Sequence, residues 1–550
     1  MRLAIWMAGW ILGAAGAQGV SGNHAVRVMD YDPGMNAGSY TNAAAALGSP
    51  SRQTHDPHPQ WGGIWPVDPF SAPYLPDQIV EMGEGGRLTL ALERPVLNDP
   101  AHPYGIDLLV FGNAFFQLNP DWVTTSGWLG GTNEGVTVVS VSAEGDRFFR
   151  LRPQGSAAID GWYPTDGQGD FGLAVNPALD AGGFAGRDLE AIRALYGGSG
   201  GGTGLDLDHA ADEQGAPVVL PWIRFIRFEQ VSGKAQIDAV SGVAPRPGLF
   251  EDFDGSPAAA DWRVAGDESL FARDETAGML QVTWDSSRPN SYFYRPLGTV
   301  LSRADDFVLG FDLRLDSIEP GITPGKPYAF QIAVALVHLE SVLDPAFVRG
   351  TGTGPRNVFE FDYFPDSGFG ATVSPVVISR DHQFAAGFEY PVELPEASWV
   401  RVLMRFSSAD ATLRTQLLRD HQVYHAIRDV VLGPEFTDFR FDAVAVCAYS
   451  DAGQDEGWGG SVRAQGALDH LMVVLPAPPA TAIHGGWTDG AWSVEWITQP
   501  GWEYTLERAT ELGEWSPVAT LEATGIGREI LQDPAPPTDG GFYRIRAVKP

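Results

Sequence analysis

Short runs in which apolar and polar residues alternate recur along the chain. The clearest extends from Phe307 to Leu315, where Phe or Leu occupies every second position. A period of two places these side chains on one face of a β-strand, so this run predicts a strand with one buried face. A single short helix is predicted at 187–196, ended by Gly197 and Gly198. Further strand-like runs lie at 26–31, 86–93, 106–112, 135–145, 147–152, 221–230, 235–243, 278–284, 328–339, 357–364, 371–379, 399–406, 412–418, 441–449 and 468–475.

Two proline-rich stretches, APRPG at 244–248 and PAPP at 476–479, divide the chain. Such stretches are typical of linkers between domains. We therefore predict a first unit at 24–244, a second at 249–475 and a small C-terminal unit at 480–550.

Composition supports an all-β chain that is rich in turns. The chain has 550 residues, of which 66 are Gly and 41 are Pro, both above the average usage of about 7% and 5%. Helices tolerate these residues poorly, whereas turns between strands require them. Apolar residues make up 44% of the chain, which excludes wholesale disorder. The expected fold class is all-β, with two large β-sandwich or jelly-roll domains followed by a small C-terminal β-sandwich module.

The net charge of -33 narrows the classes of partner. This much negative charge repels phosphate backbones and anionic membrane surfaces, so it argues against nucleic acid as a partner. Divalent cations and neutral polymers such as glycans remain open. The single cysteine, Cys447, excludes an intramolecular disulfide and is expected to be a small buried hydrophobe.

Residues 1–17 have the pattern of a secretory signal peptide. Arg2 precedes an apolar stretch from Leu3 to Leu12, and an A-x-A cleavage site ends at Ala17. The apolar stretch is shorter than the ~20 residues that span a bilayer. We expect cleavage after Ala17 and a mature chain without a transmembrane segment, located outside the cell, at its surface or in the periplasm. An uncleaved membrane anchor is the alternative.

Three parts of the chain resemble known families. In the first unit, the segments 43–50, 80–115, 136–148 and 204–243 resemble the discoidin-like β-sandwich of bacterial cell-surface and PEP-CTERM-associated secreted proteins. Gly112 replaces a Glu of that family's GxDLxVFENxF motif. The second unit opens LFEDFDG, closes ALDHLMVVLP, and resembles a concanavalin A/laminin-G-like jelly roll. The third is similar to a C-terminal β module of secreted verrucomicrobial and planctomycete proteins. These resemblances imply architecture and say little about activity, because a fold does not fix a function.

Four acids near the first and last predicted strands of the second unit form a candidate calcium site. Glu251, Asp252 and Asp254 lie at the start of this unit, and Asp469 lies on its last predicted strand. In a closed sandwich these strands lie side by side, and calcium takes about 6–8 oxygen ligands. The alternative is a set of solvated acids on an acidic surface.

A weaker cation candidate lies in GLDLDHAAD. Asp206 and Asp208 have the spacing of the first ligands of an EF-hand loop, but Ala211 stands where that loop requires Gly. An EF-hand is therefore excluded. Turn caps are favoured over a looser cation loop.

The segment Glu360-Phe-Asp-Tyr-Phe-Pro-Asp366 is the candidate for catalysis. Laminarinase-like glycoside hydrolases on a jelly roll use E-x-D-x-x-E, and Glu360 and Asp362 would share one face of a strand here. The third acid of that motif is missing, since Asp366 stands one position late and follows Pro365. Hydrolysis with retention needs two carboxyls about 5–5.5 Å apart on either side of the bond. An edge strand with exposed acids is the favoured interpretation, and a laminarinase-like hydrolase is the alternative.

Tryptophans in Gly-rich loops are the candidate ligand-binding residues. Flat indole rings stack on the apolar faces of sugar rings, whereas the opposing interpretation is that they pack beneath long loops. The residues are Trp61, Trp65, Trp122, Trp128, Trp162 and Trp458.

Together these features predict an exported, non-enzymatic, multidomain surface or matrix protein that binds extracellular glycan or a cell-envelope polymer, with calcium as a candidate structural ion. A glycan-active enzyme and a purely structural envelope protein are the alternatives.

Overall fold

The computed structural model divides the chain into two compact units, one ending at Pro245 and the other beginning at Arg246. This boundary lies inside the first proline-rich stretch. No helix in the described part is long and apolar enough to cross a membrane. The predicted signal peptide lies outside the described residues, which are 23–56, 63–100, 102–131, 134–151, 163–255, 261–350, 355–454, 459–476, 479–488, 491–499, 502–511, 514–523, 527–537 and 541–548.

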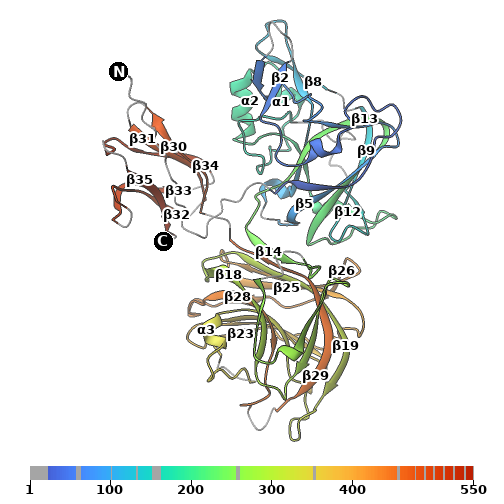
Figure 1. Cartoon of the computed structure of the whole chain (residues 1–550), viewed down its shortest axis with the longest axis vertical. Coiled ribbons are helices and arrows are strands. Elements are labelled where there is room, and N and C mark those ends of the chain that lie inside the picture. Colours follow the sequence, from blue (N-terminus) through green and yellow to red (C-terminus); the bar gives the residue numbers. More distant parts are fainter. Residues whose placement is uncertain are drawn as a thin grey trace. The chain divides into compact units, whose positions relative to one another are not determined.

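The first unit is a β-sandwich whose two layers share one long strand (Figure 1). The first half of this strand, β13 (Trp222–Gly242), pairs with β5 and β9, and its second half pairs with β4 and β6. Apolar residues of both layers, such as Leu90 and Ile237, fill the core between them. The strands are β1 (Ala25–Asp32), β4 (Val80–Met82), β5 (Arg87–Leu97), β6 (Leu108–Gly112), β9 (Glu134–Ser142), β10 (Phe149–Leu151), β11 (Thr203–Leu205), β12 (Ala210–Ala211) and β13.

A second, smaller core lies under the long connections of this unit. It contains Phe116, Tyr163, Phe184, Ile192 and Tyr196. Its elements are the hairpin of β7 (Phe115–Leu118) and β8 (Thr125–Gly130), and the helices α1 (Ala181–Phe184) and α2 (Leu189–Tyr196). A separate hairpin joins β2 (Gln53–Asp56) and β3 (Gly63–Pro66), and three short 3-10 turns lie at Ala43–Ala46, Pro103–Gly105 and Leu207–His209.

The helix predicted at 187–196 is confirmed as α2. The Asp188 carboxylate caps its N-terminus by accepting the Ala191 N–H, and Gly197 ends it with a φ of 61°. Glycine adopts this left-handed backbone without the steric cost of a Cβ, which is why the helix ends there.

The second unit contains a jelly roll of two facing antiparallel sheets (Figure 1). The nine-stranded sheet has the order β16-β17-β29-β19-β24-β25-β26, with β14 on β29 and β27 on β25. The seven-stranded sheet has the order β15-β18-β28-β20-β21-β22-β23. The elements are β14 (Gly248–Glu251), β15 (Arg263–Ala265), a 3-10 turn (Glu268–Leu270), β16 (Phe271–Asp274), β17 (Met279–Asp285), β18 (Ser291–Leu301), β19 (Phe307–Pro320), β20 (Ile332–Val337), α3 (Leu339–Val342), β21 (Val358–Phe364), β22 (Thr372–Ile378), β23 (Phe384–Ala386), β24 (Val400–Ser407), β25 (Thr412–Arg419), β26 (Gln422–Ala426), β27 (Val430–Val431), β28 (Phe441–Ala448) and β29 (Val462–Val474).

The run with period two is the centre of this core. Its Phe and Leu side chains on β19 are all buried. Phe307 and Phe311 meet Phe359 and Phe361 of β21, with ring centroids 5.1 and 5.6 Å apart. Because neighbouring positions of a strand point to opposite faces, Glu360 and Asp362 lie on the face of the seven-stranded sheet that is turned away from this core.

The C-terminal residues form two small three-stranded sheets around Trp496, Tyr504 and Leu506. One sheet has the order β30-β31-β34 and the other β33-β32-β35. The strands are β30 (Ala480–Thr488), β31 (Ala491–Thr498), β32 (Trp502–Ala509), β33 (Ser516–Ala523), β34 (Gly527–Asp533) and β35 (Phe542–Val548).

The all-β prediction is confirmed, since the regular elements of the described residues are strands apart from α1–α3 and a few 3-10 turns. The expected pairing of the first and last strands of the jelly roll is also confirmed. β14 pairs antiparallel with β29, with Glu251 opposite Leu471.

Candidate functional site

The β7–β8 hairpin displays two of the predicted ligand-binding tryptophans at the surface. Trp122 is 81% exposed and Trp128 is 73% exposed. Trp65, on β3, is 51% exposed beside the exposed Ile64. The remaining three candidates, Trp61, Trp162 and Trp458, lie outside the described residues.

One face of the hairpin packs against the small core of the first unit. Phe116 and Leu129 are paired across it and pack into the small core of Phe184 and Tyr196. The Phe116 ring centroid lies 4.9 Å from that of Phe184. One face of the hairpin is therefore fixed, while the Trp128 ring on β8 is left in solvent.

The turn that carries Trp122 is held by hydrogen bonds on both sides of it. The Asp121 carboxylate accepts N–H bonds from Val123 and Thr124, at 2.9 and 3.0 Å. Its other oxygen accepts the Thr124 hydroxyl at 2.6 Å, and these bonds lower the pKa of Asp121. The Asn119 side-chain amide donates to Thr124 Oγ1 and to the Thr125 carbonyl, both at 2.9 Å.

Trp122 itself has a φ of 58°, in the left-handed region that residues other than Gly, Asn and Asp rarely adopt. Such backbone costs about 1–3 kcal/mol and persists where the surrounding structure enforces it. Here the enforced conformation holds a large apolar ring in water instead of packing it beneath a loop.

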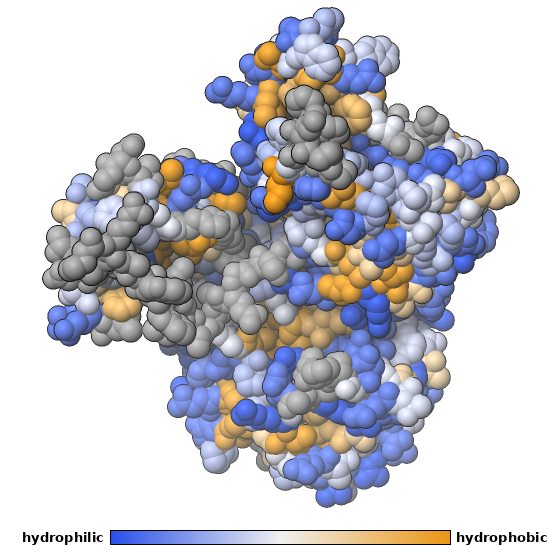
Figure 2. Space-filling view, turned by 45° about the horizontal axis from the view of Figure 1, so that its top comes forward, coloured by the Kyte–Doolittle hydropathy of each residue, from blue (hydrophilic) through white to orange (hydrophobic). Residues whose placement is uncertain are grey.

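The exposed tryptophans of this hairpin can be compared with the rest of the surface. The face shown in Figure 2 is mostly hydrophilic, with separate hydrophobic patches. Single exposed apolar residues are ordinary on soluble proteins. Two tryptophans six positions apart on one hairpin, both mostly exposed, are unusual by that standard.

The candidate catalytic acids Glu360 and Asp362 are buried, whereas an edge strand with exposed acids was expected. They are 0% and 1% exposed, because β21 lies between β20 and β22 and is covered by residues of the segment after α3. The third acid, Asp366, is exposed, and its carboxylate caps its own turn by accepting the Gly368 N–H at 3.0 Å. The structure therefore brings Glu360 and Asp362 together and leaves Asp366 apart.

Arg349 binds both buried acids, and sequence reasoning missed it. Its Nε donates to Glu360 Oε2 and its Nη2 to Asp362 Oδ2, both at 2.8 Å. Arg349 is only 4% exposed. Since Arg349 lies eleven residues before Glu360 in an irregular segment, only its charge within an apolar stretch could have pointed to it.

The two outer carboxylate oxygens of this group, Glu360 Oε1 and Asp362 Oδ1, have no hydrogen-bond partner in the described part of the chain. Burial and the neighbouring Glu360 raise the pKa of Asp362 well above its usual value, and Arg349 offsets only part of this. One cation beside two acids is balanced when one acid keeps its proton. That proton can then form a hydrogen bond between the two carboxyls.

Apart from Arg349, three polar groups near the two acids are uncharged. Tyr292, Cys447 and Asp362 lie in one row across β18, β28, β20 and β21. Burial raises the pKa values of Tyr292, Cys447 and Tyr449, so all three keep their protons. Cys447 is fully buried, as expected.

The acids proposed for calcium are only partly brought together. Both carboxylate oxygens of Glu251 accept N–H groups, from Phe253 at 2.9 Å and from the Trp262 indole at 2.7 Å. Asp469 Oδ1 accepts the His470 N–H at 2.6 Å. Burial raises the pKa of Asp469 to about 7, and the nearby charges of Asp312 and Asp252 act in the same direction.

Asp206 and Asp208 lie at the 3-10 turn Leu207–His209. Asp206 caps it by accepting the Asp208 N–H at 2.8 Å, and Asp208 accepts the Asn98 side-chain amide at 2.8 Å. The Asp206 contact is a turn cap, whereas the Asp208 contact joins two segments that are distant in the sequence.

No protein-family model matches the chain, and a search of curated proteins found no match. Among solved structures, the chain is similar to peanut lectin with a nine-residue peptide, at 13% identity and a TM-score of 0.28, over 42% of this chain and 100% of that one. It is also similar to a legume lectin-like domain from Entamoeba histolytica, at 10% identity and a TM-score of 0.25, over 40% and 96%. A third is the VIP36 exoplasmic/lumenal domain in a form bound to Ca2+ and Man2, at 12% identity and a TM-score of 0.25, over 41% and 87%. At these scores the likenesses carry no conclusion about this chain's ligand.

Proposed function

We propose that this protein is an exported, non-enzymatic surface or matrix protein that binds extracellular glycan or a cell-envelope polymer through the β7–β8 hairpin. The observation that carries the proposal is the exposure of Trp122 and Trp128, at 81% and 73%, on a hairpin anchored by a buried core.

The chemistry of the hairpin suits a polyhydroxylated ligand. An indole ring offers a flat apolar face for the C–H face of a sugar, and its rigidity keeps the entropy cost of binding low. Gln117 is exposed on β7 of the same hairpin, where its side-chain amide donates to the Leu129 carbonyl at 3.4 Å and adds a polar group to this surface. The large net negative charge favours a neutral or cationic polymer over an anionic one.

Export, location at the cell surface, outside the cell or in the periplasm, and the likeness to bacterial secreted families remain parts of this proposal. They rest on the signal-peptide pattern and the quoted motifs. Calcium also remains a proposal, as a structural ion at Asp252, Asp254 and Asp469. Glu251 fits such a site poorly, because an ion would compete with two N–H donors already bound to its carboxylate.

The test is a glycan array probed with the mature protein, with and without EDTA. We expect binding to a hydroxyl-rich polymer that Trp122→Ala and Trp128→Ala each weaken about two- to tenfold, since stacking contributes roughly 0.5–1.5 kcal/mol beyond the area it buries. Trp487→Ala is the matched control, because this indole is 59% exposed but lies in the C-terminal module.

An equal loss of glycan binding in all three variants would mean that any exposed indole binds glycan, and would contradict a specific site on the hairpin. Undiminished binding by the Trp122→Ala, Trp128→Ala double variant would contradict it as well.

A further inference from the structure

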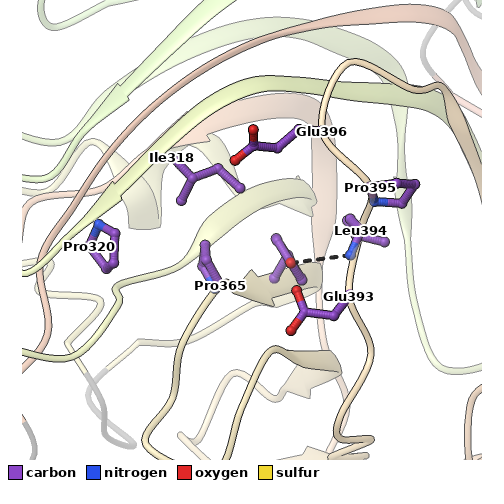
Figure 3. A pocket seen from close by; sticks show the side chains of 8 residues that line it. Ile318, Pro320, Pro365, Glu393, Leu394, Pro395 and Glu396 are labelled. Carbon is purple, nitrogen blue, oxygen red and sulfur yellow. Dashed lines mark hydrogen bonds between the residues drawn. The ribbon is translucent and has the colours of Figure 1, made fainter.

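A pocket of about 350 Å3 lies at one end of the jelly roll, between its two sheets. Its walls come from the end of β19, the end of β21 and the segment 393–396 (Figure 3). The lining residues are Ile318, Pro320, Tyr363, Pro365, Glu393, Leu394, Pro395 and Glu396. This volume is in the range of pockets that hold small molecules, about 300–1,000 Å3.

The pocket is preformed, because segment 393–396 is fixed along its length. The Leu394 N–H donates to the Tyr363 hydroxyl oxygen at 3.2 Å, as Figure 3 shows by a dashed line. The Tyr424 hydroxyl donates to the Glu393 carbonyl at 2.8 Å. Just beyond the segment, the Ala397 N–H donates to the Leu315 carbonyl at 2.7 Å.

The lining combines an apolar surface with negative charge. Five of the eight lining residues are Ile, Leu or Pro, and none is Lys or Arg. Figure 3 shows the Glu396 side chain extending toward Ile318, with the Glu393 carboxylate below Leu394. Neither carboxylate forms an ion pair or a hydrogen bond with another residue of the described chain.

The negative potential reaches the buried Tyr363 at the base of the pocket. Burial raises the pKa of Tyr363 to about 12, and the charges of Glu393 and Glu396 act in the same direction. An anion would be repelled here. A cation with an apolar stem would gain both from the carboxylates and from contact with the prolines, as Lys side chains do when the stem is buried and the ammonium stays at the surface.

We propose that this pocket binds a small aliphatic primary ammonium, whose charged group lies between Glu393 and Glu396 and whose carbon stem lies on Ile318, Leu394 and the prolines. The proposal is independent of the β7–β8 hairpin, which belongs to the other unit. Two sources share this chemistry: a free alkylamine or diamine, and a sugar with an unacetylated amine.

The test is isothermal titration calorimetry on the mature protein with pentylamine, cadaverine and glucosamine, and with pentanol and N-acetylglucosamine as uncharged counterparts. We expect a charged probe to bind and its uncharged counterpart not to. Along a series of alkylamines, affinity should rise by up to about fourfold per added methylene, until the stem fills the pocket. Added salt should weaken binding, because the rim acids are exposed.

The variant is Glu393→Gln with Glu396→Gln, which keeps the shape and removes both charges. It should weaken amine binding at least about tenfold, the loss of two charge-assisted contacts. Glu275→Gln, an exposed acid in the turn between β16 and β17, is the matched control and should bind like wild type.

Binding of pentylamine or cadaverine alone would assign the site to free amines, and binding of glucosamine alone would assign it to amino sugars. Either result supports the shared chemistry. No binding of any charged probe, equal binding of pentanol, or unchanged binding by the double variant would overturn the proposal, whatever the outcome for Trp122 and Trp128.

Discussion

Arg349, Glu360 and Asp362 form a buried ion-paired group in the jelly roll, and its protonation is set by the burial of its charges. A carboxylate in an apolar interior is costly unless it is paired and hydrogen-bonded. Arg349 pairs with one oxygen of each acid, and the other two oxygens are left to each other. Burial and the neighbouring charge of Glu360 raise the pKa of Asp362, because a second ionisation would leave a buried negative charge uncompensated.

Asp362→Asn should imitate the protonated acid and remove the pH dependence of this group. Because the folded pKa of Asp362 is raised, the folded state binds the extra proton. Wild-type stability should therefore be full below the unfolded pKa of about 4 and fall as pH rises above it. The stability of the Asn variant should not fall in this way, so the difference in unfolding free energy between the variant and wild type should grow with pH in favour of the variant. Urea unfolding from about pH 4 to about pH 8 measures this.

Asp420→Asn is the control for that series, since Asp420 is 84% exposed and its ion pair with Arg419 is a surface contact. A wild-type profile parallel to that of Asp362→Asn would mean that Asp362 is already ionised, and would contradict the shared proton.

At the scale of elements, β19 and β29 are neighbouring inner strands of the nine-stranded sheet, and their register depends on one glycine. The pairing shifts between Leu315 and Ser317, opposite Gly466. A Cβ on Gly466 would lie 2.1 Å from the Arg314 carbonyl oxygen. Since both partners are backbone, the strands themselves would have to move.

Gly466→Ala should therefore destabilise the jelly roll by about 1–3 kcal/mol, the usual cost of overpacking. Gly433→Ala is the matched control within the same domain, because nothing lies within 4 Å of a Cβ at that position. Urea unfolding measures both. Equal stability of the two variants would contradict the assigned register at the shift.

The β7–β8 hairpin illustrates the limit of sequence reasoning at this scale. The sequence allows loop tryptophans either to bind ligand or to pack beneath loops. In the structure Trp122 and Trp128 are exposed, whereas Phe116 and Tyr196 pack in the core of the same region. Composition and spacing do not separate the two groups, because both are aromatic residues near glycines.

At the scale of the whole molecule, the C-terminal residues form sheets and a core of their own. Trp496, Tyr504 and Leu506 are fully buried there, and none of the six C-terminal strands pairs with a strand of the jelly roll. A domain of about 70 residues buries only ~60% of its unfolded surface, so this module is expected to be marginally stable.

Deletion of residues 480–550 should leave the melting of the remainder nearly unchanged, because it removes no described strand from either large sheet. Differential scanning calorimetry of the full chain and the truncated chain measures this. A large fall in the melting temperature of the 24–475 fragment would instead mean that the module is a docked packing domain.

The sequence by itself determined the all-β class, the period-two strand at 307–315, the helix that ends at Gly197, and the pairing of the first jelly-roll strand with the last. These depend on local backbone preferences and on which face of a strand is apolar, and both are readable along the chain. Only the tertiary structure decided which acids are buried and which residues they pair with. Glu360 and Asp362 follow an exposed-looking pattern, yet they are buried because Arg349 is brought onto them from an irregular segment. Glu251 is bound to Trp262 for the same reason: a charge is placed by the partner that folding supplies, and that partner can lie anywhere in the chain.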